Sequence, residues 1–123
     1  MYSTLEQIAL AEFNDLVIST AQLGRRAGIT LKLRLHFRDG TFMDVWFSPD
    51  GNRYSYHWEQ RAKRGLIYRH DNAPDHPEIP TYPKHFHNGS EDRIEESYLP
   101  DDPAEALRYF LKFARTQLDD LGD

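Results

Sequence analysis

The chain has 123 residues, 39% of them hydrophobic, and a formal net charge of -5. A chain of this length can bury a hydrophobic core, and because it has no cysteine, disulfide scaffolds, thiolate zinc sites and cysteine nucleophiles are excluded. Residues 22–70 carry ten basic and four acidic side chains, whereas residues 90–123 carry four basic and ten acidic ones. We therefore expect one domain over residues 1–123, with a basic surface and an acidic surface.

The N-terminal part of the sequence predicts a helix followed by a strand. Apolar residues recur at helical spacing over residues 4–14, and Ser3 and Glu6 have the spacing of a capping box. β-branched residues favour a strand over residues 16–23. The sequence lacks both a leader pattern and an apolar run of membrane-spanning length, so we expect a cytoplasmic protein without membrane partners.

The middle of the chain predicts an antiparallel meander. Residues 29–37 alternate between apolar and polar side chains, and turn sequences follow at residues 37–40 and 48–51. A three-residue loop at the first turn pairs Leu35 with Met43 and Arg34 with Asp44. Apolar side chains then lie together on one face, and opposite charges lie together on the other. The same register at the second turn predicts a hydrophobic face of Leu31, Leu33, Leu35, Met43, Val45 and Phe47, and an opposite face of Lys32, Arg34, His36, Asp44, Trp46, Tyr54, Tyr56 and Trp58.

This second, aromatic and cationic face has two interpretations. It can bind nucleic acid as a base-stacking platform of Tyr54, Tyr56 and Trp58 beside Trp46, Lys32 and Arg34, with the basic loop at residues 61–64 in contact with phosphate. Alternatively, a helix or the loop at residues 71–89 covers it and makes the aromatic side chains a second core layer.

The last third of the chain predicts a strand, a long loop and a helix. Residues 66–70 follow a basic loop and have strand character, whereas four prolines over residues 71–89 indicate an ordered loop or short edge segments. The segment Asp102 to Glu105 has the residues of a helix start, and apolar residues at helical spacing continue to Leu121 before Gly122. The expected fold is therefore α+β, with a meander of about four to five strands and both terminal helices packed on the sheet.

Four of the six histidines lie between His70 and His87, where catalytic chemistry is best sought. His85 and His87 are two residues apart in an extended segment and so point to one side. With His76 they can divide the acid and base roles of RNA cleavage, while Arg69 and Lys84 bind phosphate. The alternatives are a metal site, completed by His70, Asp71, Asp75 or His76, and a purely structural loop.

The same segment carries a family resemblance. The runs YRHDNAPDHPEI and TYPKHFHNGSE, preceded by KLRLHFRDGTFMDVWFS and GNRYSYHW, resemble the TumE-type toxins of prokaryotic toxin–antitoxin pairs, from about Leu31 to the helix that begins PAEALRYFLKF. The most specific parts are Asp71 to Pro74 followed by His76, and Pro83 to Gly89. Where the family pattern often has paired histidines, this chain has Asp75 and His76, which leaves His76 as the stronger candidate.

The resemblance implies a small cytoplasmic α+β toxin that is neutralised by an antitoxin with a helix-turn-helix domain. Our leading hypothesis is a metal-independent endoribonuclease without a cofactor, with His76, His85 and His87 as catalytic groups. The substrate-binding candidates are Arg69, Lys84, Asp71, Asn72, Lys32, Arg34, Tyr56 and Trp58. The alternatives are a metal-dependent hydrolase or nuclease, and a non-catalytic inhibitor that binds nucleic acid or protein; a homodimer is also open.

Overall fold

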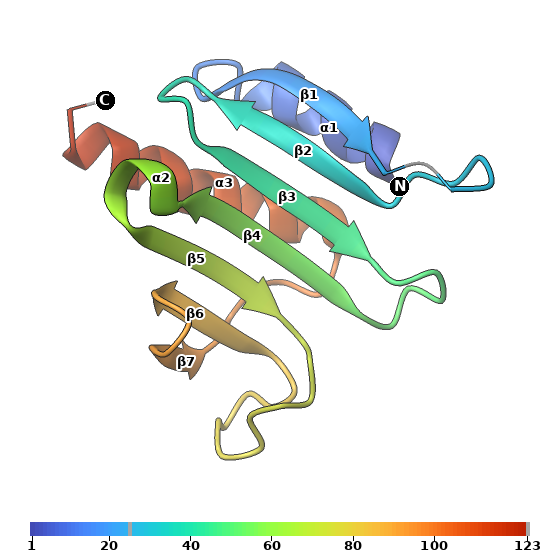
Figure 1. The fold of residues 1–123 in the computed structure, drawn as a ribbon, viewed down its shortest axis with the longest axis vertical. Helices are drawn as coiled ribbons and strands as arrows, with labels where there is room; N and C mark the ends of the chain where they lie inside the picture. The colour runs from blue at the N-terminus through green and yellow to red at the C-terminus, as the bar shows by residue number, and fades with distance from the viewer. Residues whose placement is uncertain (25, 123) are drawn as a thin grey trace.

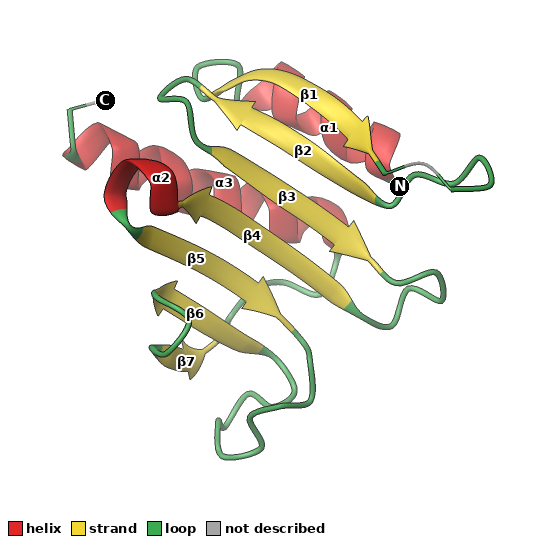
Figure 2. Ribbon diagram, viewed as in Figure 1, coloured by secondary structure: helices red, strands yellow, loops and turns green. Residues whose placement is uncertain are grey.

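The computed structural model describes residues 1–24 and 26–122, which form an antiparallel sheet with the two longer helices on one face (Figures 1 and 2). The seven strands found in these residues lie in sheet order β1 to β7, each antiparallel to its neighbours. The predicted α+β meander is thus confirmed, with more strands than the expected four to five. The elements are α1 (Tyr2–Glu12), β1 (Val17–Leu23), β2 (Lys32–Phe37), β3 (Phe42–Phe47), β4 (Tyr54–Gln60), α2 (Arg61–Arg64), β5 (Leu66–Asp71), β6 (His85–Gly89), β7 (Ile94–Glu96) and α3 (Pro103–Asp120).

The first hairpin, β2 with β3, has the predicted register. Leu35 pairs with Met43 and Arg34 with Asp44, so the hydrophobic side chains of both strands face the helices. The strand is shorter than predicted, because residues 26–29 form a tight turn closed by backbone hydrogen bonds. Leu31 therefore precedes the strand and is 44% exposed instead of joining the hydrophobic face.

The second hairpin, β3 with β4, differs from the prediction by one residue. Ser48 donates its backbone N–H to the carbonyl oxygen of Arg53 at 2.9 Å, so residues 49–52 form a loop one residue longer than expected. Such a shift moves every side chain of the next strand to the other face of the sheet. Tyr56 and Trp58 therefore face the helices, where they are only 2% and 0% exposed. The predicted base-stacking surface is wrong, and these two side chains belong to the core.

The C-terminal helix forms as predicted. The Asp102 carboxylate accepts a hydrogen bond from the backbone N–H of Glu105 at 3.0 Å, and Pro103 occupies the first helical position. Leu121 lies beyond the helix and is 58% exposed, so the predicted apolar face ends earlier. The residues of α3 that pack in the core are Ala106, Leu107, Phe110, Leu111, Ala114 and Leu118.

The N-terminal helix is also present, but its predicted cap is wrong. Helix α1 begins at Tyr2, and no side chain caps its first turn. The Glu6 carboxylate instead accepts hydrogen bonds from Thr20 and Gln22 on β1, which fix the helix against the edge strand. None of the helices in residues 1–24 and 26–122 is long and apolar enough to span a lipid bilayer.

The segment at residues 71–89, which contains four prolines, forms a loop followed by a short strand. Its four prolines all precede His85, and residues 72–84 form the loop at the bottom of Figure 2. Residues 85–89 contain no proline and pair with β5 as strand β6, in a region that the sequence analysis assigned to an ordered loop or short edge segments. This strand carries two of the three predicted catalytic histidines into the sheet.

Candidate functional site

The face of the sheet opposite the helices carries a row of ionisable side chains. Through strand pairing, Arg34 on β2 lies beside Asp44 on β3, Asp44 beside His57, His57 beside Arg69, and Arg69 beside His87 on β6. Neighbours on paired strands lie close enough to interact. Five strands thus build one continuous polar surface, referred to below as the polar face.

At one end of the polar face, Lys32 and Arg34 are occupied by an acidic neighbour. The Asp44 carboxylate accepts from Lys32 at 3.0 Å and from Arg34 at 2.8 Å. Burial acts to raise the pKa of Asp44, but hydrogen bonds from Arg34 and Lys32 outweigh burial and lower it. These two predicted substrate-binding residues therefore lie on the expected face, with their charges already paired in the protein.

At the other end, the structure brings the three predicted catalytic histidines together. His85 and His87 alternate along β6 with ring centroids 4.9 Å apart, and His76 from the loop lies 4.8 Å from His85 and 6.1 Å from His87. One ligand nitrogen of each residue lies within 4.8 Å of the others. His85 and His87 are buried, whereas the side chain of His76 is 24% exposed. The histidine cluster of these three residues therefore reaches solvent mainly through His76.

The hydrogen bonds of the histidine cluster orient all three rings in the same way. Nδ1 of His85 lies 3.1 Å from the carbonyl oxygen of Pro83, and Nδ1 of His87 lies 3.0 Å from that of Glu91. Nδ1 of His76 lies 3.2 Å from a carboxylate oxygen of Glu78. Because these oxygens only accept, each Nδ1 is the donor and carries a proton. The Nε2 atoms are left as the groups that can gain or lose a proton.

Asp71, at the end of β5, faces the two buried imidazoles. Its Oδ1 lies 3.1 Å from Nε2 of His85, and its Oδ2 lies 3.5 Å from Nε2 of His87. The carboxylate also accepts from the backbone N–H of Ala73 at 2.9 Å and from Nε of Arg69 at 3.0 Å. Burial acts to raise the pKa of Asp71, but the donors from His87, Ala73 and Arg69 outweigh burial and lower it. The ionised Asp71 carboxylate thus faces Nε2 of His85 and Nε2 of His87. A positive charge carried by or bound to these nitrogens is stabilised electrostatically by the carboxylate.

Arg69 connects the histidine cluster to the middle of the polar face. Besides Asp71, its guanidinium binds both carboxylate oxygens of Glu91, at 2.6 and 2.8 Å, and lies 3.3 Å from Nδ1 of His57. Burial lowers the pKa of His57, opposed by its hydrogen bond with Glu59. The sequence analysis missed both His57 and Glu91, and correct pairing of the second hairpin would have placed His57 on the polar face, beside Asp44.

Two other predicted substrate contacts have structural partners elsewhere. Lys84 precedes β6 and donates to the carbonyl oxygen of Leu99 and to the carboxylate of Asp101. Asn72 bridges two loops, since its side chain accepts from the backbone N–H of Tyr54 and donates to the carbonyl oxygen of Asn52. The structure therefore does not bring Lys84 into the histidine cluster. Asn72 holds two neighbouring segments of the backbone together through its hydrogen bonds.

A pocket of about 540 Å³ opens beside the histidine cluster. Its walls include the three histidines, Asp71 and Arg69, and also the exposed Arg53, a cation that the sequence analysis did not select. Polar groups therefore converge on a space that a small segment of a polymeric substrate can enter.

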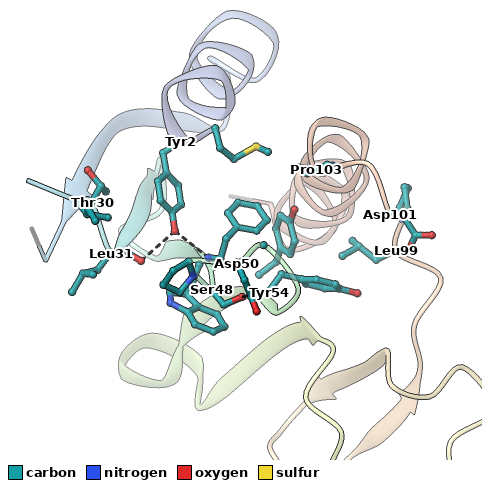
Figure 3. A pocket seen from close by; sticks show the side chains of 17 residues that line it. Tyr2, Thr30, Leu31, Ser48, Asp50, Tyr54, Leu99, Asp101 and Pro103 are labelled. Atoms are coloured by element: carbon teal, nitrogen blue, oxygen red, sulfur yellow. Dashed lines mark hydrogen bonds between the residues drawn. The ribbon is translucent and has the colours of Figure 1, made fainter. Parts of the chain in front are cut away.

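A second cavity, shown in Figure 3, differs in chemistry. It has a volume of about 460 Å³ and is mostly apolar, with Leu31, Phe47 and Leu99 in its walls. The Tyr2 hydroxyl donates to the carbonyl oxygen of Leu31 at 3.2 Å and accepts from the backbone N–H of Phe47 at 3.0 Å. None of the three clustered histidines lines this cavity, so it contributes no group to their chemistry.

His70, which the sequence analysis considered as a metal ligand, lies on the helix side of β5. It is 4% exposed, stacks on Phe86 at 4.2 Å between ring centroids, and its Nδ1 lies 2.8 Å from Oγ of Ser97. Burial lowers the pKa of His70 to about 3, with a smaller contribution from Lys84. The ring is therefore neutral in the folded protein at ordinary pH and lies apart from the histidine cluster.

This burial predicts a pH dependence of stability. Because the pKa of His70 is lower in the folded protein than in the unfolded chain, the unfolded chain binds the proton first. The contribution of neutral His70 to the free energy of unfolding is fully present above about pH 6.5. Below that pH, the free energy of unfolding decreases by about 1.4 kcal/mol for each pH unit, until the pH approaches 3. Urea unfolding of the wild type and His70→Gln between pH 5 and 8 is expected to give a shallower dependence for the variant. Parallel curves would contradict the assignment.

The fold and the site together define a class: a small α+β protein with a histidine cluster beside an open polar pocket. The family model described as Toxin TumE matches residues 8–118, and the chain therefore belongs to the TumE toxin family. It is thus a toxin of a toxin–antitoxin system, which implies a cognate antitoxin. The match also includes the last five residues of α1 and all of β1, for which the sequence resemblance gave no correspondence. Searches of curated proteins and of solved structures gave no match.

Proposed function

We propose that this toxin cleaves RNA by metal-independent acid–base catalysis at the histidine cluster. The observation that supports the proposal most directly is the convergence of three Nε2 atoms, each with its Nδ1 held by an oxygen acceptor, beside an ionised Asp71. Imidazole is the side chain best suited to transfer protons near neutral pH.

The different surroundings of the histidines divide the roles between them. His76 is the most accessible and removes the proton from the 2'-hydroxyl, whose oxygen then attacks the neighbouring phosphorus. His85 or His87, protonated opposite Asp71, donates a proton to the departing 5'-oxygen. The products are a 2',3'-cyclic phosphate and a 5'-hydroxyl end, and no water or oxidant is consumed.

Cations beside the cluster supply the electrostatic part of the mechanism. Arg69 is anchored by Asp71 and Glu91, and the exposed Arg53 lines the same pocket. A positive charge placed where charge develops on the phosphoryl oxygens lowers the barrier. Lys32 and Arg34 lie further along the polar face, where they guide the rest of the RNA strand over a surface that also contains Asp44.

The proposal extends to the protein's setting. A cytoplasmic toxin of this kind meets RNA directly, and a helix-turn-helix antitoxin supplies a basic surface for the acidic C-terminal third of the chain.

The experiment compares RNA integrity for the wild type and a variant in which His76, His85 and His87 are all replaced by alanine, each with and without chelator. Cleavage by the wild type that survives chelator and disappears in the folded variant is expected. Chelator-sensitive cleavage would contradict the proposal in favour of a metal-dependent nuclease. Growth arrest with intact RNA would contradict it in favour of a binding inhibitor, as would growth arrest that persists in the variant.

A further inference from the structure

We propose that the histidine cluster together with Asp71 also binds one Zn²⁺ ion, and that the ion inhibits the toxin. The inhibitory consequence rests on the proposed function, whereas the metal site itself rests on geometry alone. The ligands are Nε2 of His76, His85 and His87 and one carboxylate oxygen of Asp71.

The first argument is the orientation of the rings. Histidines that bind metal through Nε2 usually donate Nδ1–H to a carbonyl or carboxylate oxygen, which fixes the tautomer and points Nε2 at the ion. All three rings of the cluster have this partner, supplied by Pro83, Glu91 and Glu78.

The second argument is distance. Tetrahedral Zn²⁺ with bonds of about 2.0 to 2.1 Å places neighbouring ligand atoms about 3.3 Å apart. The distances from Asp71 to Nε2 of His85 and His87 are 3.1 and 3.5 Å, on either side of that value. The three imidazole nitrogens lie within 4.8 Å of one another and need to approach further to bind one ion, and His76 lies on the loop of residues 72–84 outside the sheet.

The third argument is charge and ligand type. Imidazole and carboxylate ligands suit zinc and its transition-metal neighbours, whereas magnesium prefers oxygen ligands and retains water. Asp71 supplies one negative charge in a buried position, and a metal ion can occupy the space that a proton fills between its oxygens and the imidazoles. The chemistry therefore selects Zn²⁺ over Mg²⁺.

The predicted consequence is inhibition. Four ligands from the protein fill a tetrahedral zinc site, as in structural sites, and leave no open position for an activated water. The same ion occupies the nitrogens that must take up and release protons during cleavage. RNA cleavage and zinc binding therefore exclude each other.

The test is equilibrium dialysis of metal-stripped full-length protein against ZnCl₂, with bound zinc measured directly. The wild type and His36→Ala are expected to bind one Zn²⁺ per chain, and His76→Ala to bind more than about 100-fold more weakly, beyond the usual cost of losing a supporting residue. His36 lies on β2, away from the cluster, and circular dichroism confirms that each variant is folded. Failure of the folded wild type to bind zinc, or equal binding by His76→Ala, would overturn the site.

An RNA cleavage assay on the same samples separates the two proposals. Loss of wild-type cleavage on adding ZnCl₂, with no loss on adding MgCl₂, supports inhibition. Cleavage that increases with ZnCl₂ would overturn inhibition even if the site is correct. If zinc binds with the expected His76 dependence but metal-free protein never cleaves RNA, the metal site stands and the proposed function fails.

Discussion

Replacing His76 with alanine is expected to reduce RNA cleavage by about two to four orders of magnitude, the range that a positioned acid or base contributes. His76 is the most exposed member of the cluster, and its imidazole pairs with the exposed carboxylate of Glu78, so its loss leaves the core intact. The rate is measured on a defined RNA under single-turnover conditions, and the free energy of unfolding is measured on the same sample. A large loss of rate with unchanged stability is the expected combination.

The matched control is His36→Ala. This residue lies on β2, four strands before the cluster in sheet order, and faces away from the helices like the catalytic residues. It should retain the wild-type rate. Equal rates for all three proteins would remove His76 from the mechanism, and equal losses in both variants would point to a general contribution of surface charge.

The largest change in stability is expected for Trp58→Ala, about 3 to 5 kcal/mol, because the side chain is fully buried. Its ring packs on Phe37, Tyr68 and Phe113, with centroids 5.7, 5.5 and 6.4 Å away, and its Nε1 donates to Oγ1 of Thr41 at 2.9 Å. Removal leaves a cavity that a rigid sheet and helix cannot fill. Urea unfolding monitored by far-ultraviolet circular dichroism measures the effect.

Trp46 provides a control of the same residue type on the neighbouring strand. It is 36% exposed and lies on the other face of the sheet, so Trp46→Ala should cost about 1 kcal/mol or less. The comparison also tests the register of the second hairpin. Small losses of similar size for Trp46→Ala and Trp58→Ala would favour the three-residue loop, which places both side chains on the same face, and would contradict the structure.

The sequence was most informative where local chemistry and burial agree. Strict alternation along β2 and the polarity of Arg34 and Asp44 predicted both the register of the first hairpin and its buried face. The Asp102 cap and the apolar spacing that follows predicted α3 for the same reason. The three histidines lie together in the structure, and alternation in an extended segment already places His85 and His87 on one side; their catalytic role stays a prediction.

The sequence was less informative where geometry depends on one residue of loop length. Nothing in Ser48 to Gly51 distinguishes a three-residue loop from the four-residue loop at residues 49–52, because the turn residues suit both. The error transferred Tyr56 and Trp58 to the wrong face and hid His57 from the site. The pairing of β6 with β5 was equally hidden, since it joins segments separated by the irregular loop at residues 72–84.

Strand β5 links the histidine cluster to the core through its alternation. Arg69 and Asp71 point to the polar face, while Tyr68 and His70 pack against aromatic residues on the helix side. Adding or deleting one residue in this strand would exchange the two sets, so that a carboxylate and a guanidinium enter the core and the imidazoles lose their anion. The length of β5 is therefore fixed by function and stability together, and changes of chain length can be accommodated only in the surface connections, such as the turn at residues 49–52.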